Sequence, residues 1–303
     1  MNDSISASNS QLSKFLAKHQ LPDAFRVIAR DYYLPLANEL PALGERARPF
    51  LLGINGAQGT GKSTLADFLS FTASSLYGWN VAVLSIDDFY HTCEQRALLA
   101  ATVHPLLRTR GVPGTHDMGM LAACLAELRS AQQGDSVALP RFDKARDDRA
   151  NRSDWPEIAG SVDMIILEGW CVGTDPQSQQ ELKQAANALE EHEDTQGLWR
   201  TYANDQLKGS YADVFAQIDA LVFLQAPGFE AIQRWRTEQE QKLAATAPQD
   251  TSGLMSDQEI VRFIQFYERL TRANLACLPN RADIVFHLNE DHEVTHRTGL
   301  QIP

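Results

Sequence analysis

The stretch FLLGINGAQGTGKSTL occupies residues 50–65. Its apolar beginning, Phe50 to Asn55, is typical of a buried strand, Gly56 to Ser63 fits the pattern G-x-x-x-x-G-K-[ST], and a helical pattern starts at Lys62. Glycines between a strand and a helix let successive backbone N–H groups turn toward phosphate, and the helix N-terminus adds roughly half a positive charge. We therefore expect a phosphate-binding loop (P-loop) for a nucleoside triphosphate.

The side chains of this loop have expected roles. Lys62 should reach the β- and γ-phosphates of ATP, and Ser63 should ligate Mg²⁺. ATP and Mg²⁺ are therefore the expected cofactors. The residues predicted to contact the nucleotide here are Gly56, Ala57, Gln58, Gly59, Thr60, Gly61, Lys62, Ser63 and Thr64.

Outward from the P-loop, apolar bursts alternate with helical stretches. This alternation predicts an α/β protein with the P-loop NTPase fold, in which a mostly parallel β-sheet is flanked by helices on both faces. The expected strands are Phe50–Asn55, Val81–Ile86, Val162–Leu167, Leu221–Gln225 and Ile284–Leu288. The expected helices are Lys62–Tyr77, Met118–Gln133, Gln177–Glu191, Gly228–Ala245 and Ser256–Ala276, with Asp117 and Ser256 as N-caps.

Carboxylates end the second and third predicted strands. A kinase that phosphorylates an alcohol needs a carboxylate to accept or orient the hydroxyl proton, and neighbouring Mg²⁺ would keep that carboxylate ionised. Strand alternation lets only one of Asp87 and Asp88 face the nucleotide. We favour Asp87 as the base, near the metal, and keep Asp88 as the alternative base and a substrate contact. Glu168, which ends MIILE, is the candidate for holding the Mg²⁺ shell.

Two loops, LLRTRGVPGTHD (residues 106–117) and PRFDKARDDR (residues 140–149), concentrate positive charge. Guanidinium groups match a carboxylate with paired hydrogen bonds, so these loops could clamp an anionic substrate. A solvated surface is the alternative interpretation of each residue. With Tyr90, the residues predicted to contact substrate are Arg110, His116, Asp117, Arg141, Asp143 and Lys144.

Arg234 and Arg236 lie on the helix expected after the fourth strand, where kinases of this type carry a lid. Arg234 is predicted to stabilise charge on the transferring phosphoryl group, and Arg236 to contact the nucleotide. The alternative is an ordinary basic helical face paired with Glu238 and Glu240.

The pattern divides the chain in two. Residues 1–48 are predicted to form an N-terminal helical extension, because apolar residues recur at helical spacing from Gln11 to Ala47, with interruptions near Pro35 and Pro41. Residues 49–303 are predicted to form a P-loop kinase domain with a helical lid. Ala244 to Gly253 is expected to be a mobile loop.

The composition of the chain limits the classes of molecule that it is expected to bind. The 303 residues carry a formal net charge of -12, which disfavours nucleic acid and anionic membranes, because both require clustered Lys and Arg. No segment reaches the ~18 unbroken apolar residues of a membrane span. The N-terminus lacks the basic and then apolar order of a secretory signal, and the four cysteines show no metal or disulfide spacing, so a cytoplasmic enzyme with a small-molecule substrate is expected. The oligomeric state is not predicted.

Six motifs in order make the chain resemble the D-glycerate 3-kinase family, which is related to phosphoribulokinase, uridine kinase and bacterial pantothenate kinase. They are GAQGTGKST, LSIDDFYHT, RGVPGTHD, PRFDKARDDR followed by DWPE, LEGW and QRWR. The resemblance implies ATP, Mg²⁺ and phosphorylation of the 3-hydroxyl of glycerate. It also implies that Asp87 is the base and Glu168 the Walker B acid. Phe142 stands where tyrosine is common in the family, and this departure touches the substrate loop.

Other functions remain open at this point. The same phosphate machinery could serve another small alcohol, such as uridine, pantothenate or a sugar phosphate. A P-loop ATPase that acts on a protein partner is an alternative from another class, although the sequence has no N-K-x-D guanine motif. A nucleotide-binding protein without catalysis is disfavoured, because Lys62, Ser63, Asp87 and Glu168 are all present.

Overall fold

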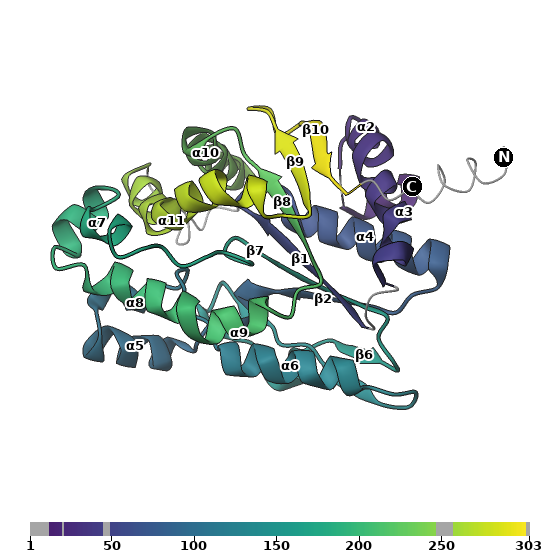
Figure 1. Cartoon of the computed structure of the whole chain (residues 1–303), viewed down its shortest axis with the longest axis horizontal. Coiled ribbons are helices and arrows are strands. Elements are labelled where there is room, and N and C mark those ends of the chain that lie inside the picture. The colour runs from purple at the N-terminus through teal and green to yellow at the C-terminus, as the bar shows by residue number, and fades with distance from the viewer. Residues whose placement is uncertain (1–11, 20, 45–48, 247–256, 301–303) are drawn as a thin grey trace.

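The computed structural model describes residues 12–19, 21–44, 49–246 and 257–300. Its centre is a six-stranded sheet with the strand order β10-β9-β8-β1-β7-β2 (Figure 1). All pairs are parallel except β10 with β9, so the predicted mostly parallel α/β fold is confirmed. The strands are β1 (Phe50–Gly56), β2 (Val81–Ser85), β7 (Met164–Gly169), β8 (Ala220–Gln225), β9 (Ile284–Leu288) and β10 (Val294–Gly299).

Helices cover both faces of the sheet, and each face has its own hydrophobic cluster. Leu52 and Ile54 of β1 point into one cluster, whereas Leu51 points into the other, as strand geometry requires. The helices of the first cluster are α4 (Lys62–Tyr77), α10 (Phe229–Thr246) and the N-terminal helices. Those of the second are α6 (Met118–Ser130), α8 (Leu198–Gln206) and α9 (Ala212–Phe215), and α11 (Asp257–Cys277) contributes to both.

The N-terminal extension packs on the same core. Its described part comprises helical residues 12–19, α2 (Phe25–Ile28), a π-helical turn (Ala29–Tyr33) and α3 (Leu34–Gly44). The rings of Phe15 and Phe25 lie 5.3 and 6.3 Å from that of Phe68 in α4. Tyr32 donates a hydrogen bond of 2.8 Å to the Thr295 carbonyl in β10. The boundary at residue 48 stays a prediction, although the helices before it share a core with the sheet.

The five predicted strands and four of the five predicted helices are confirmed. Asp117 caps α6, because its carboxylate accepts the Met120 N–H at 2.9 Å. Ser256 and residues 247–253 of the expected loop lie outside the described residues, and residues 244–246 complete α10. Strand β10 was not predicted, because its sequence VTHRTG lacks an apolar pattern.

The predicted helix Gln177–Glu191 is wrong. That segment holds a short 3₁₀ turn (Glu181–Lys183) and the beginning of α7 (Ala188–Glu193). Side chains outside the segment take some of its backbone donors: Asn204 accepts the Gln177 N–H at 2.6 Å, and Gln265 of α11 accepts the Leu189 N–H at 3.1 Å. Asn187 then caps α7. Side-chain acceptors from elsewhere in the fold therefore replace a helical ladder.

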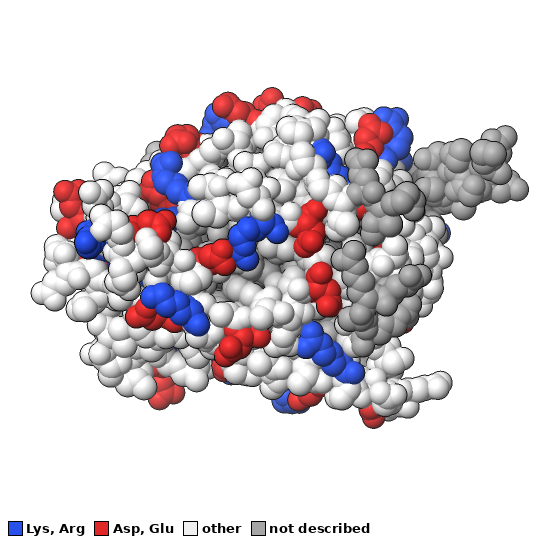
Figure 2. Space-filling view, viewed as in Figure 1, with Lys and Arg blue, Asp and Glu red and all other residues white. Residues whose placement is uncertain are grey.

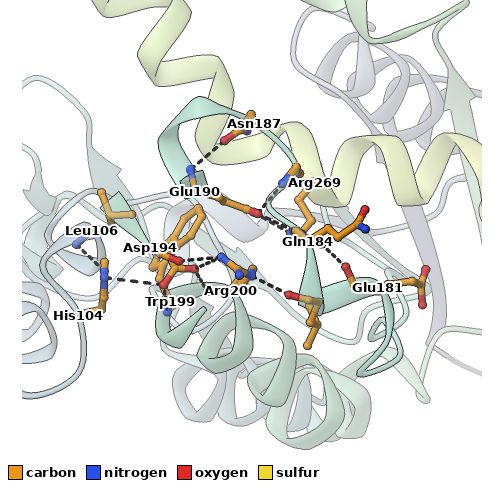
Figure 3. A network of polar contacts seen from close by, with 12 residues as sticks. His104, Leu106, Glu181, Gln184, Asn187, Glu190, Asp194, Trp199, Arg200 and Arg269 are labelled. Atoms are coloured by element: carbon orange, nitrogen blue, oxygen red, sulfur yellow. Dashed lines mark hydrogen bonds and ion pairs between the residues drawn. The ribbon is translucent and has the colours of Figure 1, made fainter. Parts of the chain in front are cut away.

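A buried network of charges joins α7, α8 and α11 (Figure 3). Glu190 is fully buried and forms an ion pair of 2.5 Å with Arg269 of α11. Asp194 is 1% exposed and forms an ion pair of 3.0 Å with Arg200. Its carboxylate also accepts a hydrogen bond of 2.9 Å from the Trp199 N–H. Each buried carboxylate thus has a cation and further donors, which is the arrangement that makes a buried charge tolerable.

The segments at residues 92–116 and 140–156, which include most of the two basic loops, contain short elements that position the site. They are α5 (Cys93–Thr102), 3₁₀ turns at Pro105–Arg108 and Arg152–Asp154, and the paired strands β4 (Phe142–Asp143) and β5 (Asp148–Arg149). A second small ladder pairs β3 (Ser136–Ala138) with β6 (Glu157–Ala159).

No helix in the described part of the chain is long and apolar enough to cross a membrane. Figure 2 shows Lys and Arg side chains interspersed with Asp and Glu on the face it presents, without a broad patch of one sign. That face offers no basic surface of the kind that nucleic acid requires.

Candidate active site

A cavity of about 450 Å³ opens at the carboxyl ends of β1, β2 and β7. This is the edge at which open α/β sheets bind their ligands. The predicted site residues that line it are Gln58, Gly59, Lys62, Ser63, Asp87, Tyr90, Arg110, Lys144, Glu168 and Arg236. The structure therefore brings together residues from the P-loop, both acidic strand ends, both basic loops and α10.

The P-loop has the backbone that phosphate binding needs. Gly59 and Gly61 have φ angles of +81° and +88°, which favour glycine. The Thr60 hydroxyl and the Lys62 ammonium both donate to the Ala57 carbonyl, at 2.8 and 3.1 Å. Burial lowers the pKa of Lys62, while the carboxylates of Glu168 and Asp87 oppose this shift.

Contacts from the C-terminal half of the chain brace the P-loop. The ring of His292 stacks on Trp235 of α10 at a centroid distance of 4.1 Å. Its Nδ1 lies 3.0 Å from the Gly59 carbonyl. The turn between β9 and β10 therefore touches the backbone expected to hold the triphosphate.

Ser63 and Glu168 meet where the Mg²⁺ site is predicted. The Ser63 hydroxyl donates to Glu168 Oε1 at 2.9 Å, and Glu168 is only 7% exposed. A hydroxyl and a carboxylate are hard oxygen donors that suit Mg²⁺ held jointly by protein and substrate phosphate. No cluster of three or more His, Cys, Asp or Glu side chains among the described residues would hold a metal by itself. The residues present fit a metal that arrives with the nucleotide.

Asp87 lines the cavity and is already ion-paired. Its carboxylate accepts hydrogen bonds from Lys144 at 2.9 Å and from the Tyr90 hydroxyl at 3.1 Å. Burial alone would raise the pKa of Asp87, but Lys144, with help from Lys62, outweighs it and lowers that pKa below its ordinary value. Asp87 is thus a carboxylate at neutral pH, as a proton acceptor must be.

Asp88 turns away from the cavity and holds the second basic loop. It accepts the Phe142 N–H at 3.1 Å and a bond from Arg141 at 3.3 Å. Burial raises its pKa, against the effect of Arg141. The two acids diverge as predicted, but for a different reason: β2 ends at Ser85, and Asp87 and Asp88 lie on a 3₁₀ turn (Ile86–Phe89) rather than on a strand.

His116 lies behind the cavity wall rather than in it. Its ring stacks on Tyr90 at 4.3 Å, and its Nδ1 lies 2.6 Å from the Tyr211 hydroxyl. Burial lowers the pKa of His116 to about 3, so the ring is neutral at physiological pH. In this structure His116 supports Tyr90, which in turn bonds Asp87.

Four other predicted residues also make contacts outside the cavity lining. Asp117 caps α6 and accepts a bond from Arg149 at 3.2 Å. Asp143 accepts the N–H groups of Ala145 and Arg146, which shapes the turn between β4 and β5. The remaining two, Arg141 and Arg234, pair with Asp88 and with Glu290 (3.1 Å), respectively.

Arg234 and Arg236, the two arginines predicted to lie on a lid, point in different directions. Arg234 points to Glu290 and Glu238, close to the alternative of a paired helical face. Arg236 lines the cavity and lies over the ring of Phe263 in α11, 5.4 Å from its centroid. Of the two, Arg236 is the one placed to meet a phosphate.

Five lining residues were not predicted: Ser85, Gly169, Trp170, Phe263 and Tyr267. Trp170 stood in the LEGW motif, and its indole N–H donates to the Gly111 carbonyl at 3.1 Å. Phe263 and Tyr267 sit four residues apart on α11, a spacing indistinguishable from that of core residues. Gly111 admits the tyrosine, because a Cβ there would lie 2.6 Å from its hydroxyl oxygen.

Comparisons with known proteins place the chain among kinases. No family model matches the chain. It is 34% identical over 251 residues to an uncharacterized kinase of Schizosaccharomyces pombe, covering 80% of this chain and 85% of that protein. It is 31% identical over 245 residues to the chloroplastic D-glycerate 3-kinase of Arabidopsis thaliana, covering 78% of this chain but only 50% of that longer protein.

Among solved structures, a D-glycerate 3-kinase from Cryptococcus neoformans superposes with a TM-score of 0.72. The match covers 88% of this chain and 99% of that one, at 26% identity.

Proposed function

Because the chain belongs to the D-glycerate 3-kinase family of P-loop kinases, we propose that it transfers the γ-phosphate of ATP to a hydroxyl of D-glycerate, with Mg²⁺ as cofactor. The family makes it an ATP-dependent phosphotransferase with a small-molecule substrate. The proposal concerns D-glycerate as the acceptor, Mg²⁺ as the metal and the roles of the individual residues. That the enzyme acts in the cytoplasm stays a prediction of its sequence.

One observation supports the proposal above the others: Lys62, Asp87 and Arg110 line a single cavity. A phosphate-binding cation, a carboxylate base and a guanidinium for an anionic acceptor are the three groups that phosphorylation of a hydroxy acid requires.

The proposed chemistry uses these side chains in turn. The P-loop amides and Lys62 bind the β- and γ-phosphates, and Arg236 neutralises charge on the moving phosphoryl group. Arg110 binds the carboxylate of the acceptor and orients its hydroxyl toward Asp87. Asp87 accepts the hydroxyl proton as the hydroxyl oxygen bonds the γ-phosphorus and the bond from that phosphorus to the β-phosphate oxygen breaks, which releases ADP. Mg²⁺, held at Ser63 and Glu168, would supply charge neutralisation on the phosphates.

The charge of the cavity helps to distinguish D-glycerate from other possible acceptors. Arg110 and Lys144 give its acceptor side positive charge, which suits a carboxylate better than neutral uridine. Pantothenate and sugar phosphates carry a negative charge too, so they are the rivals that need direct comparison. A P-loop ATPase acting on a protein would instead hydrolyse ATP without any small alcohol.

The test is an ADP-release assay with D-glycerate, pantothenate, uridine and ribulose 5-phosphate at matched concentrations, with and without Mg²⁺. We expect Mg²⁺-dependent turnover that is fastest with D-glycerate, and ³¹P NMR of the product should show a phosphate ester on the 3-hydroxyl. No turnover with D-glycerate, or preference for another alcohol, would refute the acceptor. ATP hydrolysis that no acceptor stimulates would favour the ATPase.

A further inference from the structure

Arg96 of α5 is a buried cation that lies outside the six motifs. Its side chain is 1% exposed, the largest of the fully buried side chains among the described residues. A buried guanidinium is costly unless its donors and its charge are both satisfied. The contacts of Arg96 should therefore show what makes a buried charge tolerable at this place.

The donors of Arg96 join three segments. Nε donates to the His91 carbonyl at 3.1 Å, Nη1 to the Arg108 carbonyl at 2.9 Å, and Nη2 to the Asp147 carbonyl at 2.6 Å. Each acceptor stands near a cavity residue: His91 follows Tyr90, Arg108 precedes Arg110 by two positions, and Asp147 follows Lys144 by three. Arg96 therefore fastens the backbone on which the acceptor side of the cavity is built.

Two arginines share the carboxylate of Asp147. Arg96 Nη2 lies 2.9 Å from Oδ2, and Arg110 Nη1 bonds Oδ1. Asp147 has a φ of +53°, a left-handed conformation that aspartate tolerates better than most residues, and this turn aims its carboxylate at both cations. The three side chains together carry one net positive charge.

We propose that Arg96 is a positioning residue for the acceptor: by balancing the charge of Asp147, it leaves the positive charge of Arg110 available to the substrate carboxylate. The inference rests on the proposed function, because it requires an anionic acceptor. Without Arg96, Asp147 and Arg110 would form a neutral pair, and the acceptor would have to compete with Asp147 for the guanidinium.

A rescue experiment separates charge balance from mere packing. In steady-state assays, R96Q should raise the KM for D-glycerate on the order of tenfold, while the KM for ATP changes by no more than about twofold. The double variant R96Q/D147N should recover a large part of this loss, because no carboxylate then neutralises Arg110. A purely structural role predicts that the second substitution adds to the damage.

Arg200 provides a matched control, because it is a buried arginine bound to the Leu182 carbonyl and Asp194, away from the cavity lining (Figure 3). R200Q should lower the melting temperature and leave the KM for D-glycerate unchanged. If R96Q does not fold, R96K answers the question: it keeps the charge with fewer hydrogen bonds, so the KM should stay within about threefold of wild type.

The outcomes are distinct. An unchanged KM in R96Q, additive loss in R96Q/D147N, or a tenfold rise in R96K overturns the role of Arg96 while wild-type turnover with D-glycerate stands. A wild-type enzyme that does not phosphorylate D-glycerate refutes the proposed function, and the inference falls with it.

Discussion

Lys144 Nζ lies 2.9 Å from the carboxylate of Asp87, so the predicted base meets its substrate already paired with a cation. Lys144 comes from the loop between β4 and β5, and its side chain is 62% exposed. The ion pair therefore joins a long, largely exposed lysine side chain to a carboxylate in the cavity. A substrate hydroxyl that approaches Asp87 must share this carboxylate with Lys144.

Asp87→Asn should reduce turnover by a factor on the order of 10² or more, because the amide cannot accept the hydroxyl proton. ATP binding, measured by isothermal titration calorimetry, should change little. D88N is the matched variant and should keep most of the turnover, because Asp88 bonds Phe142 and Arg141 outside the cavity. If D88N loses turnover and D87N does not, the base is Asp88.

Lys144→Met should move the acid limb of the pH profile of kcat/KM to higher pH. Lys144 helps to lower the pKa of Asp87, so its removal lets that pKa rise, and the base is then protonated over a wider acidic range. Lys208→Met, which removes an exposed lysine paired with Asp205, is the control and should leave the profile unchanged. An unmoved acid limb in K144M would mean that the profile does not report Asp87.

Arg236→Ala should lower kcat/KM at least about tenfold, because a cation at the phosphates is lost from the cavity. Arg234→Ala, two residues away on the same helix, should stay within about twofold, because Arg234 pairs with Glu290 at the surface. Steady-state kinetics of both variants decide between them. The reverse ranking would restore the catalytic role first predicted for Arg234.

Arg269→Met should reduce the free energy of unfolding by about 3–5 kcal/mol, because it leaves the fully buried Glu190 without its cation. Arg262→Met on the same helix breaks an exposed pair with Glu193 and should cost no more than about 1 kcal/mol. Urea unfolding of both variants measures the difference. Equal losses would show that the network in Figure 3 adds nothing beyond surface pairing.

Local patterns predicted what local physics determines. The P-loop and the parallel strands follow from short-range signals in the sequence, whereas Asp87 and Asp88 diverge on a 3₁₀ turn that strand alternation did not predict. Long-range partners decided the rest: Asn204 and Gln265 accept backbone N–H groups of the segment expected to be a helix at residues 177–191, and Glu290 pairs with Arg234 at the surface.

The residues missed in the site share a cause. Arg96, Phe263 and Tyr267 look like ordinary residues of amphipathic helices, and only the tertiary fold brings them to the cavity or its supporting loops. A motif search finds residues that touch phosphate through a fixed local geometry. It does not find those whose role depends on which loop lies beside them.

The packing of Phe15 and Phe25 against Phe68 bears on how this enzyme can be shortened. Phe68 belongs to the helix whose first turn presents Lys62 and Ser63. A version beginning at residue 49 would lack Phe15 and Phe25 and would expose Phe68 on the outer side of that helix. We expect this shortened version to aggregate or to bind nucleotide more weakly, because the helix that presents Lys62 and Ser63 would lose apolar cover on its outer side.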